Sequence, residues 1–314
     1  MDGKLILVAL GGNAILKKTD SGSYEDQLKN VRKTCKSLAE LMETGYRLLI
    51  THGNGPQIGN ILLQNDVAKH IVPPMSMDVC GAQSQGLIGY MIQQSLQNEF
   101  SRRGIKTSVA TLITQVLVDE KDEAFKNPTK PIGPFYEREE AERLEREKGY
   151  HITEDSGRGY RRVVPSPKPK KIVEAECIKK LLKKGFVVIA SGGGGIPVVR
   201  KNKILIGVEA VIDKDLAGER LAEEVGANIL LCLTDVERVY LNYGKPNQKP
   251  IDKMSLKEAE RYIREGHFGK GSMEPKIIAS IRFIKDGGER AIISSLDKAP
   301  SSLRGKAGTT IERF

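Results

Sequence analysis

Residues 187–215 read VVIASGGGGIPVVRKNKILIGVEAVIDKD and give the clearest indication of the fold. Its first four residues are apolar and mostly β-branched, which is typical of a buried strand. Ser191 and the glycines 192–195 follow directly. Glycine has no side chain, so another group can approach the backbone N–H donors closely. Asp213-Lys214-Asp215 then stands where a helix is expected to start. A backbone cradle followed by a lysine suggests a phosphoryl site, and a flexible loop beside a surface lysine explains this stretch equally well.

Two other apolar runs also end in glycine-rich turns. Residues 4–10 lead into Gly11-Gly12-Asn13, and residues 47–50 lead into Gly53-Asn54-Gly55 after a short polar step. Fully apolar strands that alternate with helices predict a parallel sheet covered on both faces. Ligands of such sheets bind beyond the carboxyl ends of the strands. The two common nucleotide-binding motifs, G-x-x-x-x-G-K-[ST] and G-x-G-x-x-G, do not occur at these turns.

Periodicity predicts the remaining elements. We expect helices over 24–45, 58–100 with a break at Pro73-Pro74, 172–184, 216–225 and 254–265, and a last helix ending at Asp286. Further strands are expected over 107–118, 229–233 and 290–294, and the segment 305–310 is expected to close an edge of the sheet.

A segment of different character interrupts this alternation. Residues 119–171 contain six prolines and a charged helical run over 136–148. We interpret the segment as an inserted subdomain that could act as a lid, with a solvated excursion as the alternative. The chain is then a single domain with a small-substrate side over 1–185 and a nucleotide side over 186–314.

Composition excludes several classes of protein. The chain has 314 residues, 39% of them hydrophobic, and no apolar run approaches the ~20 residues of a membrane helix. The net charge is +10, but lysines and arginines alternate with glutamates, so they form no basic stripe. We therefore do not expect the protein to bind nucleic acid. The four cysteines form no C-x-x-C pair and no metal pattern. Together with the absence of a signal-peptide pattern, they predict a cytoplasmic protein with reduced thiols.

Several motifs together resemble the carbamate kinases of the amino-acid kinase family, over essentially the whole chain. The glycine-rich turns are shared with acetylglutamate and uridylate kinases, whereas the Lys130 segment and the E-D-S-G-R-G run are more specific. The matching motifs are ALGGNA (9–14), THGNGPQ (51–57), NPTKPIGPFY (127–136), EDSGRG (154–159), ASGGGG (190–195), AVIDKDLA (210–217), LTDV (233–236) and GSMEPK (271–276).

The resemblance implies an open, mostly parallel eight-stranded αβα sandwich, a homodimer, and a phosphotransferase with a carboxyl-group acceptor. The implied reaction is ATP + carbamate ⇌ ADP + carbamoyl phosphate, with Mg²⁺ carried on the nucleotide phosphates and no metal ligand in the chain. We expect the ATP-forming direction, as in arginine breakdown, although the motifs are the same for both directions.

The resemblance also implies roles for individual residues. Lys214 and Lys276 would bracket the transferred phosphoryl group, Lys130 would reach the carbamoyl phosphate side, and Asp215 would hold the ammonium groups without acting as a base. The small-substrate and phosphoryl side would comprise Gly11, Gly12, Asn13, Gly53, Asn54, Ser191, Gly192 and Gly193. The nucleotide side would comprise Asp213, Thr234, Asp235, Tyr240, Gly271, Met273 and Pro275.

Other interpretations remain open at this point. His52 lies inside a motif, but we interpret it as a packed neutral histidine, and Tyr160, Arg161 and Arg162 as structural. The chain could instead be another member of the superfamily with a different acid or phosphate acceptor. It could also be a nucleotide sensor without turnover.

Overall fold

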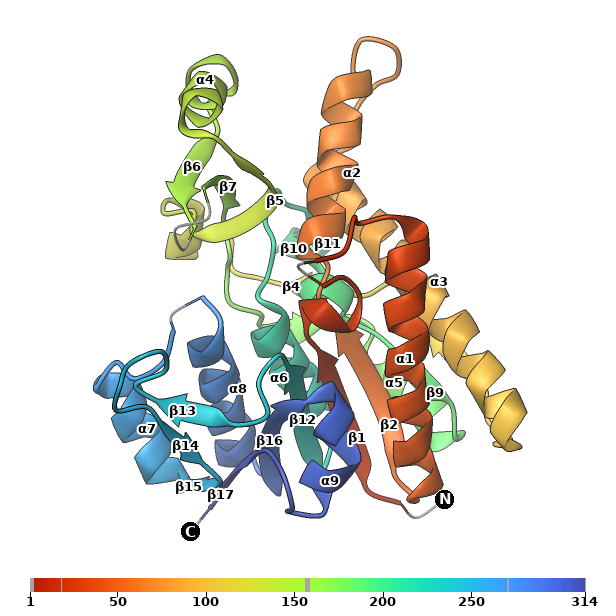
Figure 1. The fold of residues 1–314 in the computed structure, drawn as a ribbon. Helices are drawn as coiled ribbons and strands as arrows, with labels where there is room; N and C mark the ends of the chain where they lie inside the picture. Colours follow the sequence, from red (N-terminus) through yellow and green to blue (C-terminus); the bar gives the residue numbers. More distant parts are fainter. Residues whose placement is uncertain (1–2, 18, 156–158, 270, 314) are drawn as a thin grey trace.

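The computed structural model describes residues 3–17, 19–155, 159–269 and 271–313. Its centre is an eight-stranded sheet with the order β15-β17-β16-β12-β1-β2-β9-β3 (Figure 1). Every neighbouring pair is parallel except β16 and β17. The expected α/β fold with a mostly parallel sheet is therefore confirmed. The strands are β1 (Leu5–Leu10), β2 (Arg47–His52), β3 (Val109–Thr111), β9 (Val187–Ile189), β12 (Ile229–Thr234), β15 (Lys253–Ser255), β16 (Arg290–Ser295) and β17 (Thr309–Glu312).

Helices cover both faces of this sheet because its central strands are apolar on both faces. Along β1, Leu5 and Leu7 join one core cluster, whereas Ile6 and Val8 join the other. The first cluster is covered by α5 (Ala175–Lys183), α6 (Lys214–Val225), α7 (Leu256–Arg264) and α8 (Met273–Lys285). The second is covered by α1 (Tyr24–Glu43), α3 (Met77–Arg103) and α9 (Ala299–Leu303).

Three sequence-based expectations need correction. The strand expected over 107–118 is two short strands, β3 and β4 (Gln115–Leu117), which belong to different sheets. The helix expected from Met254 begins at Leu256, because Met254 lies in β15 and Ser255 caps the helix in a capping box with Glu258. The segment expected to close the edge leads into β17, which lies between β16 and β15 rather than at the edge.

A second sheet lies beside the carboxyl ends of the main strands, with the order β11-β10-β4-β8. Its hairpin of β10 (Ile196–Lys201) and β11 (Ile204–Gly207) forms within the stretch that defined the fold, and periodicity did not reveal it. The short strand β8 (Lys171–Ile172) precedes α5. A further two-stranded sheet consists of β13 (Val239–Leu241) and β14 (Lys249–Ile251).

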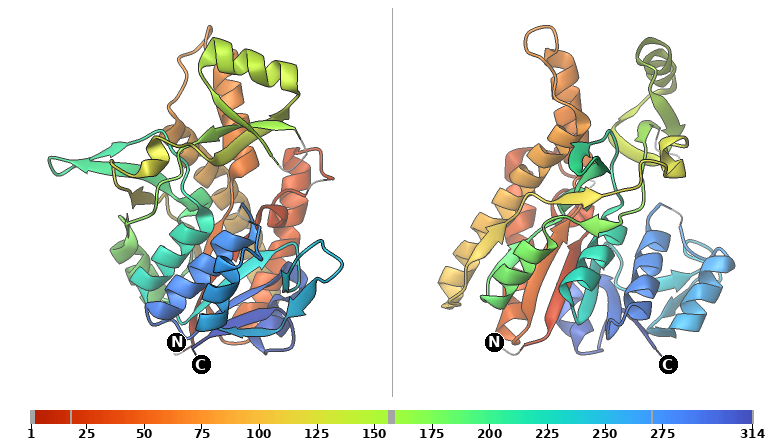
Figure 2. Two further views of the ribbon diagram at one scale, coloured as in Figure 1. Left: turned by 90° about the vertical axis from the view of Figure 1, so that its left-hand side faces the viewer. Right: turned by 180° about the vertical axis from the view of Figure 1, so that it is seen from behind.

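The insert forms a small unit of its own, with a three-stranded sheet in the order β5-β7-β6 and one helix. It stands above the main sheet next to α2 (Gly55–Ala68), as Figures 1 and 2 show. Gly59 of α2 and Gly133 of β5 are in such close contact that a Cβ on Gly59 would lie 2.1 Å from the Gly133 Cα. The elements of the insert are β5 (Lys130–Tyr136), α4 (Arg138–Lys148), β6 (His151–Glu154) and β7 (Tyr160–Val164).

The division of the chain near residue 185 stays a prediction. β9 follows that point in sequence but pairs with β2 and β3. None of the described helices is both long enough and apolar enough to span a membrane.

Candidate active site

The glycine-rich turns after β1 and β2 meet at the carboxyl end of the sheet. A Cβ on Gly53 would lie 3.8 Å from the Lys214 side chain and 3.9 Å from the Gly12 backbone nitrogen. Gly11 donates its N–H to the Leu233 carbonyl oxygen at 2.8 Å, and a Cβ there would lie 2.7 Å from that oxygen. Only glycine fits this approach, so the sequence of the turn is fixed by the contact between β1 and β12.

The turn after β9 packs against the turn after β2. Gly192, Gly193 and Gly194 form a short 3₁₀ turn, in which Gly193 has a φ of 66°. A Cβ on Gly192 would lie 2.4 Å from His52 Nε2, and one on Gly193 would lie 2.0 Å from Asn54 Nδ2. The glycines therefore leave room for two side chains of the protein itself: His52 lies where a Cβ of Gly192 would be, and Asn54 lies where a Cβ of Gly193 would be. A role of these glycines in binding a phosphoryl group stays a prediction.

Buried polar contacts hold the start of this turn. Ser191 has a φ of 53°; its N–H donates to Thr114 Oγ1 at 2.9 Å, and its carbonyl oxygen accepts from Thr51 Oγ1 at 2.8 Å. The Ser191 hydroxyl is buried without a hydrogen-bond partner among the described residues. Asn54 Nδ2 donates to Ser84 Oγ at 2.7 Å. Thr51, Ser84 and Thr114 were missed by sequence reasoning because their partners lie far away in the chain.

Lys214 and Lys276 converge on one buried carboxylate. Lys214 Nζ lies 2.8 Å from Asp215 Oδ1, and Lys276 Nζ lies 2.9 Å from Asp215 Oδ2. Asp215 is 4% exposed and Lys276 is 9% exposed. Burial alone would raise the pKa of the Asp215 carboxyl, but the two ammonium groups outweigh it and hold that pKa below its usual range. Burial would lower the pKa of Lys276, which the Asp215 carboxylate instead raises. Lys276 is therefore charged at neutral pH.

Lys130 reaches the same helix start from the insert. Its Nζ lies 2.6 Å from Asp213 Oδ2. Asp213 Oδ1 accepts from the N–H groups of Asp215 and Leu216 and caps α6. Both oxygens of Asp213 are therefore engaged within the protein. This ion pair connects the insert to α6.

Four of the residues predicted for the nucleotide lie together around one cavity of about 290 Å³. Arg238, Tyr243, His267 and Phe268 also line it, although sequence reasoning did not single them out. The Tyr240 and Tyr243 ring centroids are 5.9 Å apart, and two tyrosines three residues apart in the sequence were a signal that could have pointed here. Gly271 and Pro275 do not line the cavity, and neither does Asp213. The predicted residues that line it are Thr234, Asp235, Tyr240 and Met273.

A second cavity of about 310 Å³ adjoins the turn after β1. Gly11 and Asn13 line it, and Thr234 and Asp235 are common to both cavities. The turn after β12 therefore lies between the predicted small-substrate residues and the predicted nucleotide residues.

His52 lies fully buried at the end of β2. Its Nδ1 lies 3.0 Å from the Gly53 carbonyl oxygen, which can only accept, so Nδ1 carries the proton. Burial lowers the pKa of His52 to about 4, against the opposing hydrogen bond to Gly53. The contact with Gly192 and the low pKa agree with a packed neutral histidine.

This pKa predicts a loss of stability in mild acid. The pKa of His52 is lower in the folded protein than in the unfolded chain. Its contribution to the free energy of unfolding is therefore fully present above pH 6.5 and is lost as the pH falls toward 4. The shift corresponds to roughly 3 kcal/mol. Urea unfolding at several pH values should show a steeper loss between pH 6.5 and 4 for the wild type than for His52→Gln. Equal slopes would contradict a buried neutral His52.

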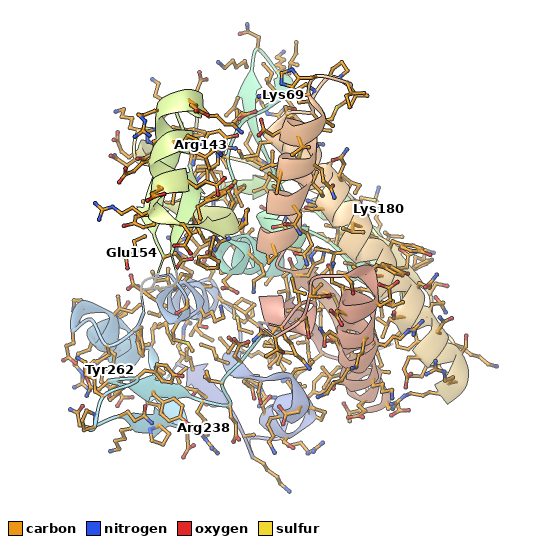
Figure 3. All side chains as sticks on the ribbon, turned by 45° about the horizontal axis from the view of Figure 1, so that its top comes forward. Lys69, Arg143, Glu154, Lys180, Arg238 and Tyr262 are labelled. Carbon is orange, nitrogen blue, oxygen red and sulfur yellow. The ribbon has the colours of Figure 1, made fainter. Side chains whose placement is uncertain are left out.

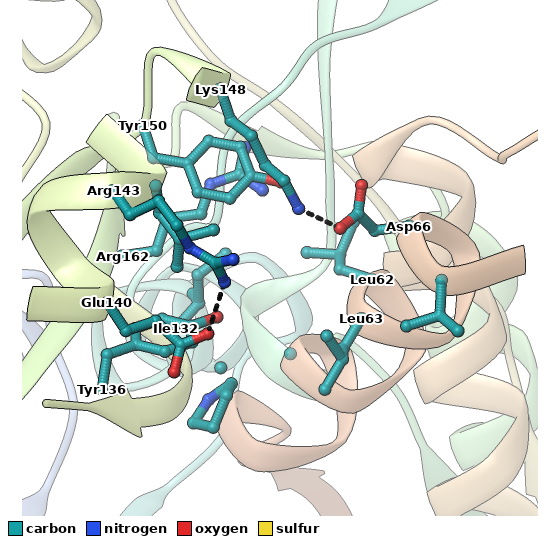
Figure 4. A pocket seen from close by; sticks show the side chains of 15 residues that line it. Leu62, Leu63, Asp66, Ile132, Tyr136, Glu140, Arg143, Lys148, Tyr150 and Arg162 are labelled. Atoms are coloured by element: carbon teal, nitrogen blue, oxygen red, sulfur yellow. Dashed lines mark hydrogen bonds and ion pairs between the residues drawn. The ribbon is translucent and has the colours of Figure 1, made fainter. Parts of the chain in front are cut away.

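The insert encloses a cavity of about 240 Å³ with α2, drawn in Figure 4. Lys148 of α4 pairs with Asp66 of α2 across it, and the Arg162 guanidinium lies 4.0 Å from the centre of the Tyr150 ring. Figure 3 labels Arg143 on α4 and Lys69 at the end of α2, the two helices whose residues line this cavity.

The arginines after the E-D-S-G-R-G run have partners within the insert. Arg161 donates to the Gly133 carbonyl oxygen from Nε and Nη2 and pairs with Asp155 at 3.1 Å, which agrees with a structural role. Residues 156–158 of the run lie outside the described residues.

Comparisons with known proteins agree with this geometry. Residues 4–295 match the model of the amino acid kinase family. A carbamate kinase from Thermococcus kodakarensis is 56% identical over 99% of each chain, and one from Pyrococcus horikoshii is 56% identical over 98% of each chain. The solved structure of a carbamate kinase from Giardia lamblia bound to AMP-PNP has a TM-score of 0.93 at 44% identity, over 100% of this chain and 99% of that one. The chain belongs to the amino acid kinase family and, within it, groups with the carbamate kinases.

Proposed function

We propose that the protein is a phosphotransferase that catalyses the reversible reaction ATP + carbamate ⇌ ADP + carbamoyl phosphate. The observation that carries this proposal is the group of Lys214, Asp215 and Lys276 at the carboxyl end of the sheet. Full-length relatives named carbamate kinase supply the substrate. A carbamate oxygen forms the new bond to the γ-phosphorus while the bond from that phosphorus to the bridging oxygen of ADP breaks.

The proposed chemistry needs positioned cations rather than a base. Carbamate is already an anion, so no proton has to be removed from the attacking oxygen. Phosphoryl transfer is accelerated mainly by alignment and by charge stabilisation on the equatorial oxygens. Lys214 and Lys276 would supply that charge, and Asp215 would fix both ammonium groups without taking up a proton. The lowered pKa of Asp215 supports this role, because it keeps the carboxyl ionised.

The two substrates would meet at the turn after β12. The small acid and the phosphoryl group would lie against the turns that contain Gly11, Gly53 and Ser191, where the buried Ser191 hydroxyl has no hydrogen-bond partner among the described residues. The nucleotide base would enter the cavity beside Tyr240 and Met273. The Giardia enzyme was solved with AMP-PNP, an ATP analogue, which supports a nucleotide site in this fold.

Magnesium would be held mainly by the nucleotide phosphates. Asp213 and Asp215 are engaged with lysines in the protein. Asp235 is exposed beside the nucleotide cavity and is the carboxylate that could contact a metal ion carried in on the phosphates. The ion would shield the phosphate charge and polarise the transferred group.

Lys130 would bring the insert to the acyl phosphate. The ion pair holds the Lys130 ammonium group at the start of α6, because its partner Asp213 is the residue directly before Lys214. We therefore assign Asp213 the task of positioning Lys130 and capping α6. A lid role for the insert fits this connection to α6, and the pair of Lys148 with Asp66 joins the insert to α2 as well.

A homodimer is part of the proposal. Exposed apolar side chains on α3 and β11 offer a face that a second copy could cover: Val79, Leu87, Tyr90, Ile204 and Ile206. We also propose that the enzyme works in the ATP-forming direction. A place in arginine metabolism and a cytoplasmic location are further parts of this proposal.

A substrate panel tests the proposed function. With Mg-ATP, the purified protein should release ADP in the presence of carbamate, supplied as ammonium and bicarbonate, and not with N-acetylglutamate or uridine monophosphate. His52 and Asn54 fill the space beside Gly192 and Gly193. We expect the site to suit the small carbamate anion rather than an N-acyl amino acid. Preferred turnover of one of the larger acceptors would overturn the assignment to carbamate, and nucleotide binding without turnover of any acid would favour a sensor.

A further inference from the structure

Three carboxylates come together between α6 and α8, away from the lysines of the active site. The two helices pack side by side in both views (Figures 1 and 2). Glu219 and Glu223 are one turn apart on α6, and Asp286 is the residue directly after α8. One oxygen from each carboxylate lies within 4.8 Å of the other two.

Glu219 is the unusual member of this cluster. It is 0% exposed, and neither of its carboxylate oxygens has a hydrogen-bond partner among the described residues. A buried acceptor without a partner costs about 1–3 kcal/mol, and more when it is charged. Burial raises the pKa of Glu219 to about 7, although Arg220 and Arg282 oppose this shift. The fold thus holds an unsatisfied buried carboxylate facing two others.

Access to the cluster comes from a cavity of about 240 Å³. Glu223 and Asp286 line this cavity, which also borders the turn 286–289 after α8. Glu223 is half-buried and Asp286 is exposed, so a small ion could pass from solvent toward the buried Glu219.

We propose that Glu219, Glu223 and Asp286 bind a divalent cation of the Mg²⁺, Mn²⁺ or Ca²⁺ class. Oxygen donors suit these hard cations, and no thiol or imidazole belongs to the cluster. Arg220 pairs with Glu223, and Arg282 is a second guanidinium near Glu219. The three carboxylates outnumber these two cations once Glu219 is ionised, and a bound cation would offset the remaining negative charge. It would also supply the partner that Glu219 lacks.

The cation would act as a clamp on the helices that carry the active-site lysines. Glu219 lies one turn after Asp215 on α6, and Asp286 lies at the opposite end of α8 from Lys276. Binding there joins α6 to α8 without contact with the transferred phosphate. The site is therefore distinct from magnesium carried on the nucleotide, and the proposal does not depend on the reaction assigned above.

Manganese titration of nucleotide-free protein tests the proposal. After treatment with a chelator and its removal, electron paramagnetic resonance should detect a single bound Mn²⁺ per chain, and Ca²⁺ or Mn²⁺ should raise the melting temperature. Asp286→Asn should weaken Mn²⁺ binding at least about tenfold. Because Asp286 is exposed, this variant should fold normally.

Two further variants complete the test. Glu219→Gln should abolish both the binding of Mn²⁺ and the rise of the melting temperature with cations. Glu40→Gln removes one half-exposed carboxylate from α1, on the other face of the sheet, and should change neither.

Two outcomes would overturn the site. One is the absence of bound Mn²⁺ and of any cation effect on the melting temperature, whatever the stability of Glu219→Gln; Glu219 would then be a buried acid without a cation. The other is Mn²⁺ binding that is unchanged in both Asp286→Asn and Glu219→Gln, which would place the bound ion elsewhere.

Discussion

Replacing Lys214 by alanine is expected to lower kcat about 100- to 1,000-fold, which corresponds to roughly 3–4 kcal/mol of lost transition-state stabilisation. The ammonium group faces the turns that would hold the phosphoryl group, and a Cβ on Gly53 would lie 3.8 Å from its side chain. Stability should change far less, because Asp215 keeps Lys276 as a partner at 2.9 Å. The measurements are kcat in a coupled assay and the melting temperature of the same preparation.

Lys257 offers a matched control for this variant. It is an exposed lysine on α7, so Lys257→Ala should leave kcat and the melting temperature close to those of the wild type. Near-normal turnover in Lys214→Ala would refute the catalytic role. A parallel collapse of activity and melting temperature would show that Lys214 acts through the fold instead.

Asp215→Asn is expected to destabilise the protein by about 3–5 kcal/mol and to abolish most of the activity. The substitution keeps the shape of the side chain but leaves two largely buried ammonium groups without their counter-charge. Urea unfolding at neutral pH measures the loss of stability.

A surface ion pair provides the comparison for Asp215. Asp119 lies 2.6 Å from Lys170, and their side chains are 43% and 54% exposed. Water screens such a pair, so Asp119→Asn should lower the free energy of unfolding far less than Asp215→Asn does. Equal effects of Asp119→Asn and Asp215→Asn would contradict the importance of burial at the active site.

The parts of the fold that could be predicted are those fixed by local pattern. The apolar runs at Leu5–Leu10 and Ile229–Thr234 are buried on both faces, and such runs predict parallel strands directly. The start of α6 was also readable, because Asp213 is a good N-cap directly before an apolar helical pattern. Lys214 and Asp215 were singled out from that position and from the family motif.

The parts that escaped prediction depend on contacts between distant segments. The break between β3 and β4 separates strands that join different sheets, and no change in residue type marks it. The role of the glycines 192–194 depends on His52, Asn54 and Ile212, which pack where side chains would be. The cluster around Glu219 joins residues of two helices far apart in sequence, and each of them alone resembles an ordinary surface charge.

ATP formation by the wild-type protein from Mg-ADP and carbamoyl phosphate, followed with a coupled hexokinase assay, tests the proposed reaction most directly. ATP should form only when both substrates are present, and its rate should fall at least about 100-fold in Lys214→Ala but persist in Lys257→Ala. If folded wild-type protein forms no more ATP than a control without enzyme, the protein does not catalyse this reaction.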